Sequence, residues 1–269
     1  IDHPADVALL TTREQARRAG VSPATMTRFA QRLGMKGYDE VRKLYADVMR
    51  RRPESFRGRA QELVHRRDAE GDAALIQDIF ASLALHLQTL SSPQASKRFS
   101  AAAERIAKAE RVFCLGLRST FSVVYIFHYV RSLFGAASIL VDGAGDTGVD
   151  VLRSIEKGDV LLAVTARPYT RLTLKAAHYA KSRGAKIIAI TDSELSPLAP
   201  LADDILLVGT ETPSFFHSMT PAFAAVECLA ALVAARRGSD TLKSLARSEA
   251  QLSAFDTYVL APKRATTRS

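Results

Sequence analysis

The sequence predicts two domains: a small all-α domain, followed by an α/β domain built on a doubly wound, five-stranded parallel sheet. Short helical segments punctuated by glycine fill about the first fifty residues, which is typical of a small helical domain. Beyond about residue 110, short apolar runs alternate with amphipathic segments. That alternation is typical of parallel strands whose connecting helices cover both faces of the sheet.

The positive charge is concentrated in the first part of the chain. The net charge is +9, and residues 1–67 hold 15 Lys and Arg against 8 Asp and Glu, whereas the remaining 202 residues hold 22 against 20. A basic region joined to a nearly neutral one is typical of a nucleic-acid-binding domain attached to an effector domain. A solvated basic face would have the same composition. We expect one domain and its linker over 1–70 and the second over 71–269.

Capping signals divide the N-terminal region into helices. Thr12, with Gln15 three residues later, forms a capping box, and Gly20 is placed to end that helix. Ser22 followed by Pro23 is a strong start for the next helix. We expect helices over 12–19, 23–33 (stopped by Gly34) and 39–52, a linker or exposed helix over 53–71, and further helices over 72–90 and 95–109.

The helix over 23–33 has two different faces. Met26, Phe29, Ala30 and Leu33 share one face at helical spacing. The other side carries hydrogen-bonding side chains suited to phosphates and major-groove base edges, and the short turn over 19–21 gives helix-turn-helix geometry. A small bundle with a polar outer face would show the same pattern. The polar residues in question are Thr25, Thr27, Arg28, Gln31 and Arg32.

The same region resembles the DNA-binding head of RpiR-type sugar-metabolism regulators. Residues 20–38 read GVSPATMTRFAQRLGMKGY, against GVSPATVSRFCRKLGFKGF in that family. The resemblance implies that residues 22–33 form the recognition helix, beginning at Ser22, and that Lys36 and Tyr38 lie close to the DNA backbone. The family has a longer helix before Asp6 than the few residues present here, so we expect a truncated first helix.

The α/β region carries two hydroxyl-rich loops, each after a predicted strand. They are Gly116–Thr120 and Thr165–Thr170. Ligands of open parallel sheets bind at the carboxyl ends of the strands, and hydroxyls, helix-start N–H groups and guanidinium groups hold anions. Serine and threonine at helix starts are also common as plain caps. We expect strands over 111–115, 137–141, 160–164, 186–190 and 204–208, and helices over 120–134, 147–156, 170–183, 196–202, 215–237 and 240–256.

Residues 95–237 resemble the SIS (sugar isomerase) domain that follows the head in RpiR-type regulators. The clearest match is ITDSELSPLAPLAD over 190–203, against ITDSPLSPLAPLAD in the family. The family binds a sugar phosphate with a glycine-rich first loop that ends in serine and a second loop reading Ser-x-Ser-Gly-x-Thr. The resemblance implies that Thr120 replaces the serine of the first loop, and that Thr165 and Thr170 take the outer positions of the second.

Both loops depart from the family pattern in ways that add positive charge. Arg118 stands where glycine is usual, Arg167 replaces a serine and Pro168 replaces a glycine. A branch with GLRSS and an arginine–tyrosine pair is the nearer relative. Guanidinium groups bind carboxylates as readily as phosphates, so we expect a small anionic metabolite, either a sugar phosphate or a related sugar acid. The expected contacts are Arg118, Ser119, Thr120, Thr165, Arg167, Tyr169, Thr170 and His217.

No catalytic constellation is evident. His217, expected at the start of the helix over 215–237, could reach the pocket as an acid, a base or a donor. The sequence shows no carboxylate partner, so a helix-cap or interface histidine is the favoured interpretation. We therefore expect no enzyme activity. The alternative is a phosphosugar isomerase that carries a basic accessory head.

Other sites are disfavoured by the same patterns. Residues 143–148 match G-x-G-x-x-G, but they follow the second strand and no acidic residue ends the next one, so we expect no cofactor; NADP held by Arg167 is the open alternative. The two cysteines and six histidines lack metal-ligand spacing. The longest near-apolar stretch, 222–235, contains Glu227 and is too short to span a membrane.

These observations predict a cytoplasmic transcription regulator that does not interact with a membrane. Its heads are expected to read a palindromic double-stranded DNA operator as a pair, within a homo-dimer or tetramer. Binding of the anionic effector would alter the affinity of the heads for the operator.

Overall fold

The computed structural model describes residues 10–50, 55–135, 137–142 and 147–259, and these form two compact units. The first lies within 1–84 and includes 211–218. The second lies within 85–210 and 219–269.

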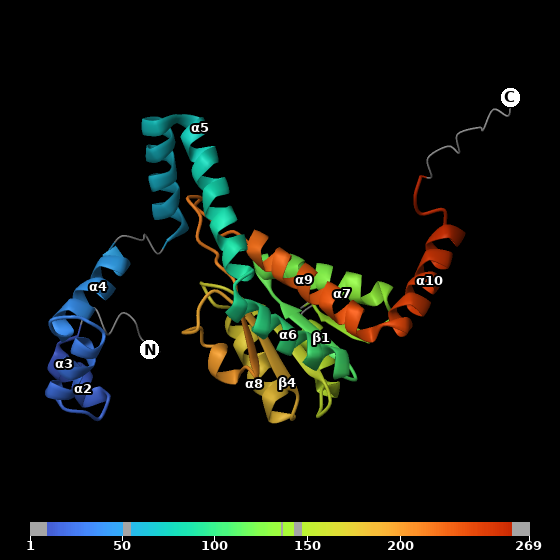
Figure 1. Cartoon of the computed structure of the whole chain (residues 1–269), viewed down its shortest axis with the longest axis horizontal. Coiled ribbons are helices and arrows are strands. Elements are labelled where there is room, and N and C mark those ends of the chain that lie inside the picture. The colour runs from blue at the N-terminus through green and yellow to red at the C-terminus, as the bar shows by residue number, and fades with distance from the viewer. Residues whose placement is uncertain (1–9, 51–54, 136, 143–146, 260–269) are drawn as a thin grey trace. The chain divides into compact units, whose positions relative to one another are not determined.

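The N-terminal unit begins with three short helices, α2 (Thr12–Arg18), α3 (Pro23–Arg32) and α4 (Tyr38–Arg50) (Figure 1). The first prediction was wrong by one residue, because the cap of α2 is Thr11, whose hydroxyl accepts from the backbone N–H of Glu14. Gln15 does not close a capping box; its side chain is buried and its amide donates to the carbonyl of Leu10.

The turn signals on either side of α3 are confirmed. Ser22 caps the helix by accepting from the N–H of Thr25, and Pro23 occupies its first turn. Gly20 and Gly34 have φ angles of 67° and 81°, in the left-handed region that glycine adopts without the steric cost borne by other residues. The chain therefore reverses at both ends of α3.

The segment expected as a linker or exposed helix is helical. It belongs to α5 (Phe56–Leu90), which is interrupted at Gly71 by φ 81° and ψ 170°. By length and composition alone, α5 is the one described helix long and apolar enough to cross a membrane. Its break at Gly71 divides it into two shorter helices.

The helix expected over 215–237 begins later. It is α9 (Thr220–Arg237), with Pro221 in its first turn. Residues 211–218 instead form an irregular segment of the N-terminal unit, in which Phe216 stacks on Phe56 at a ring-centroid distance of 5.4 Å. Proline is favoured in a first turn because its fixed φ suits a helix and its missing N–H has no partner there.

The second unit is the predicted doubly wound parallel sheet. Its strand order is β2-β1-β3-β4-β5, all neighbours are parallel, and each strand lies within one residue of its expected bounds. The strands are β1 (Val112–Gly116), β2 (Ser138–Val141), β3 (Val160–Thr165), β4 (Lys186–Thr191) and β5 (Asp204–Leu207).

Two apolar layers enclose the sheet, as side chains alternate between its faces. One face packs against α6 (Pro93–Lys108), α7 (Phe121–Leu133) and α9, and the other against α8 (Arg171–Ser182) and short 3₁₀ turns (Figure 1). A final helix, α10 (Ser239–Ala254), follows α9. The turns of the second layer are η3 (Gly148–Ser154), where a helix over 147–156 was expected, and η4 (Ala199–Leu201), within the expected 196–202. A further turn, η1 (Arg118–Thr120), precedes α7.

Candidate functional site

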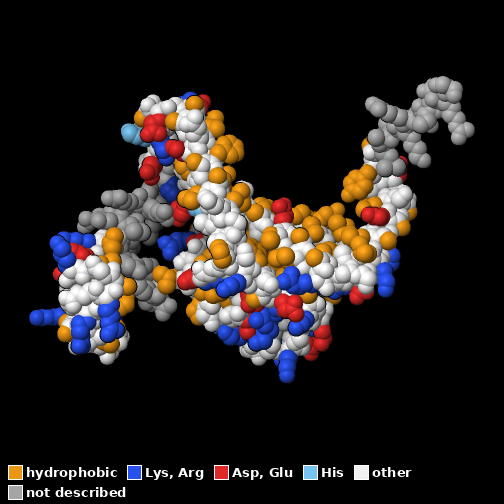
Figure 2. Space-filling model, in the orientation of Figure 1, with side chains coloured by type: hydrophobic (Ala, Val, Ile, Leu, Met, Phe, Trp, Pro, Cys, Tyr) orange, Lys and Arg blue, Asp and Glu red, His pale blue; other side chains and the backbone are white. Residues whose placement is uncertain are grey.

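The outer side of α3 presents a polar and basic surface. Arg28, Gln31 and Arg32 are exposed, as is Lys36 just beyond the helix. Figure 2 shows lysine and arginine side chains gathered over α2 and α3. Among the described residues, none of these four side chains is ion-paired, although Arg28 makes a long 3.5 Å contact with the hydroxyl of Thr25. Four hydrogen-bonding side chains are therefore available to a partner.

The three hydroxyl residues of this region are partly engaged within the helix. Ser22 is the cap, and its hydroxyl lies 2.9 Å from that of Thr25. The hydroxyl of Thr27 donates to the carbonyl of Pro23 at 3.2 Å. Each oxygen keeps acceptor capacity, but these residues also hold the first turn of α3 together.

Tyr38 has a different environment from the other predicted DNA contacts. It is buried with Ala30 and Val41 in the core of the head, and its hydroxyl donates to the side-chain oxygen of Gln15 at 2.8 Å. Tyr38 therefore stabilises the core of the N-terminal helices. The predicted apolar face of α3 is only half correct: Met26 and Ala30 pack inward, whereas the side chains of Phe29 and Leu33 are 53% and 56% exposed.

The loop after β1 is tightly held. The hydroxyl of Thr120 is buried and lies 2.9 Å from the carbonyl of Leu117 and 3.1 Å from that of Val164 in β3. A Cβ at Gly116 would lie 2.5 Å from the backbone oxygen of Thr120. The Thr120 hydroxyl thus ties the first loop to the neighbouring strand, and it makes no cap bond to α7.

Arg118 adopts a backbone conformation suited to glycine. Its φ is 58°, in the left-handed region that costs a residue with a Cβ about 1 kcal/mol or more. Glycine is usual at this position in the family that the loop resembles. The exposed arginine keeps the glycine-like turn and adds a guanidinium group at the carboxyl edge of the sheet.

The loop after β3 leaves more of its polar groups available. Thr170 occupies the cap position of α8 but makes no side-chain cap bond. The hydroxyl of Tyr169 is buried and has no well-formed hydrogen bond among the described residues. Burial, reinforced by the nearby Asp192 carboxylate, raises the pKa of Tyr169 to about 12. Thr165 is buried in the sheet, whereas Arg167 is exposed.

Asp192 is a member of this loop cluster that the sequence analysis missed. Its carboxylate accepts from the backbone N–H of Arg167 at 3.3 Å and from the hydroxyl of Thr191 at 3.3 Å. The position was visible in the ITDS segment, directly after β4. The Asp192 carboxylate would repel an anionic group placed next to it, but it can accept hydrogen bonds from hydroxyl groups. It therefore favours a ligand that carries hydroxyl groups as well as an anionic group.

His217 stacks on Phe216 within the N-terminal unit, with ring centroids 4.1 Å apart. Its role as an effector contact stays a prediction. The G-x-G-x-x-G match falls largely on 143–146, outside the described residues. No three His, Cys, Asp or Glu side chains gather as metal ligands within the described ranges.

Comparisons with known proteins agree with this organisation. Residues 105–232 match the SIS domain family. An uncharacterised HTH-type transcriptional regulator of Caldanaerobacter subterraneus subsp. tengcongensis is 25% identical over 260 residues, covering 94% of this chain and 89% of the relative.

Two solved structures share the fold. The sugar isomerase domain of an RpiR transcription factor from Sphaerobacter thermophilus is 24% identical, with a TM-score of 0.57, covering 69% of this chain and 99% of that one. The NanR protein of Vibrio vulnificus, solved in complex with ManNAc-6P, is 21% identical, with a TM-score of 0.54, covering 93% and 88%.

Proposed function

We propose that this chain, an RpiR-type transcriptional regulator with a helix-turn-helix head and a SIS domain, binds a DNA operator through α3 and senses a small anionic metabolite. The observation that carries the proposal is the exposed polar side of α3. Its guanidinium and amide groups suit phosphates and base edges, and the turn before it is the tight Gly20 turn of a helix-turn-helix.

The DNA contacts that we propose exclude Tyr38. Arg28 and Arg32 on α3, with Lys36 beyond it, supply charge to the phosphates, and Gln31 and the hydroxyls of the first turn reach base edges. Each phosphate contact releases counterions, so binding should weaken steeply as salt rises. Two heads of a homo-oligomer would read the two halves of a palindromic operator.

The effector site that we propose lies at the loops after β1 and β3. Arg118, Arg167 and the hydroxyl of Thr170 provide charge and hydrogen bonds for an anionic group, and Asp192 accepts from ligand hydroxyls. NanR, which shares the fold, was solved with ManNAc-6P, and a sugar phosphate or sugar acid offers both kinds of group. We expect this sensor to be cytoplasmic and to lack catalytic activity.

Arg28→Ala tests the DNA half of the proposal. A labelled genomic duplex, selected by binding to the parent protein, is titrated and followed by fluorescence anisotropy at several salt concentrations. Loss of one phosphate contact should weaken binding and reduce the slope of log affinity against log salt by about 1. The matched control is Arg183→Ala, which removes an exposed charge from the second unit and should leave the slope unchanged.

The result is decisive either way. Unchanged affinity and slope in Arg28→Ala, with the variant folded by circular dichroism, would reject α3 as the DNA-contacting helix. Equal losses of DNA affinity in both variants would show that binding depends on the overall positive charge of the protein and not on a contact from Arg28.

A further inference from the structure

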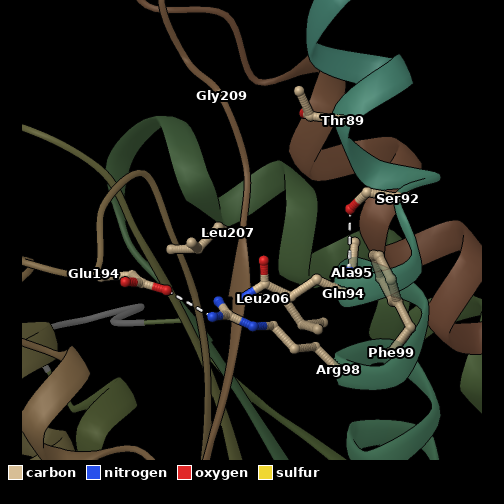
Figure 3. Close-up of a pocket in the computed structure, with 10 residues that line it drawn as sticks. All are labelled: Thr89, Ser92, Gln94, Ala95, Arg98, Phe99, Glu194, Leu206, Leu207 and Gly209. Carbon is tan, nitrogen blue, oxygen red and sulfur yellow. Dashed lines mark hydrogen bonds and ion pairs between the residues drawn. The ribbon is translucent and has the colours of Figure 1, made fainter.

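A cavity of about 200 Å³ lies at the carboxyl end of β5, and none of its lining residues belongs to the loops after β1 and β3 (Figure 3). Its walls come from the end of α5, the first turns of α6, the end of β5 and the segment after β4. None of the residues predicted to bind DNA or effector lines it. The lining residues are Thr89, Ser92, Gln94, Ala95, Arg98, Phe99, Glu194, Leu206, Leu207 and Gly209.

One ion pair spans the cavity. The Nη2 atom of Arg98 lies 2.6 Å from the Oε1 atom of Glu194. Figure 3 shows the arginine reaching from α6 past Leu206 to meet the glutamate. The side chain of Glu194 is 59% exposed, and exposed ion pairs of this kind are weak. Another anion could therefore replace Glu194 on Arg98 at little cost.

The two hydroxyl groups of the wall are already engaged. The hydroxyl of Ser92 caps α6 by accepting from the N–H of Ala95, and the hydroxyl of Thr89 donates to the carbonyl of His86. Arg98 is the cationic side chain of the lining.

Glu194 lies in the segment after β4, and the partner of its carboxylate in the structure is the Arg98 guanidinium of the cavity. A side chain that occupies a binding group from within the same molecule competes with any ligand for that group.

We propose that the cavity binds a small organic anion whose carboxylate or phosphate displaces Glu194 from Arg98. The body of the ligand would lie against the apolar wall of Ala95, Phe99 and Leu206. Glu194 is then an internal competitor rather than a ligand contact. This site is separate from the loops after β1 and β3 and does not depend on the proposed effector site.

Calorimetric titration of the full chain with gluconate, glucose 6-phosphate and neutral glucose tests the proposal. At least one anion should bind and glucose should not; a preference between the two identifies the carboxylate or the phosphate. Arg98→Gln should weaken binding by about tenfold, the value of a charged hydrogen bond. Glu194→Gln should strengthen it by about two- to fivefold, because the competing ion pair is lost.

Arg167→Gln, in the loop after β3, separates this site from the proposed effector site. If the anion binds in the cavity, its affinity is unchanged in Arg167→Gln and reduced in Arg98→Gln. The opposite pattern places the anion at the loops and overturns the cavity site. Absence of binding by both anions, or weaker binding in folded Glu194→Gln, also overturns the proposal.

Discussion

The loops after β1 and β3 follow neighbouring strands and were predicted from the same kind of evidence, yet their hydroxyl groups are used differently. In the first, Thr120 is buried and its hydroxyl bridges the loop and β3 through two backbone carbonyls. In the second, Thr170 makes no cap bond and Tyr169 holds a buried hydroxyl without a well-formed bond. The Thr120 hydroxyl of the first loop therefore stabilises the fold, whereas the hydroxyl groups of the second loop are available to a ligand.

The difference also shows that one sequence signal can have three roles. A threonine at the start of a helix can cap it, cross-link the fold or bind a ligand, and these roles have the same local sequence. Neither Thr120 nor Thr170 makes the side-chain cap bond. The distinction depends on which carbonyl lies within reach, and for Thr120 that carbonyl belongs to Val164, 44 residues away in the chain.

Thr120→Val should have the largest effect. Valine keeps the shape of threonine but removes the buried hydroxyl that reaches the Val164 carbonyl, whereas the Leu117 carbonyl keeps the Thr120 N–H as a donor. The free energy of unfolding should therefore fall by about 1–3 kcal/mol. Urea unfolding followed by circular dichroism measures the change. Thr170→Val is the matched control and should change stability by less than about 0.5 kcal/mol. Similar losses in both variants would remove the contrast between the loops.

Arg118→Gly should have an intermediate effect of opposite sign. Glycine adopts a φ of 58° without the steric cost paid by arginine. Stability should rise by up to about 1 kcal/mol, reduced by the greater flexibility of glycine in the unfolded chain. Arg118→Ala removes the same charge but keeps a Cβ, so it should show no such gain. A gain in stability in both variants would show that the cause is the loss of the positive charge and not the relief of backbone strain.

At neutral pH the smallest effect concerns Tyr169, because the effect appears only in alkaline solution. Its folded pKa of about 12 lies above the ordinary value of 10.0, so the folded state holds this proton more tightly. The associated stability is present below pH 10 and lost as pH rises from 10 to 12. The pKa of Tyr129 is also raised, by its hydrogen bond to Tyr258, so absorbance titration should show late ionisation of more than one of the seven tyrosines. Tyr169→Phe should reduce the amplitude of the late step. An unchanged amplitude would place the perturbed tyrosine elsewhere.

Local signals predicted the secondary structure well because their causes are local. Gly20 and Gly34 end helices through left-handed backbone, and Ser22 with Pro23 starts α3. The apolar runs of the sheet were placed within one residue of their observed bounds because parallel strands are buried on both faces. The errors were equally local: Thr11 rather than Thr12 caps α2, and Pro221 rather than Phe215 marks the start of α9.

Long-range contacts decided the roles of individual site residues. Nothing near Tyr38 in the sequence indicates that its hydroxyl binds Gln15, 23 residues earlier. The proximity of Asp192 to Arg167 arises because β3 and β4 are paired in the sheet. The pair of Arg98 and Glu194 joins α6 to the segment after β4 in the same way.

The sequence by itself determined the two-part organisation, the order of helices and strands, and the basic outer side of α3, since all of these follow from spacing, capping and charge along the chain. Only the tertiary structure decided which hydroxyls and charges are already satisfied within the molecule. The physical reason is that a polar group is available to a ligand only when no neighbour in space, however distant in sequence, has taken its hydrogen bond or its charge.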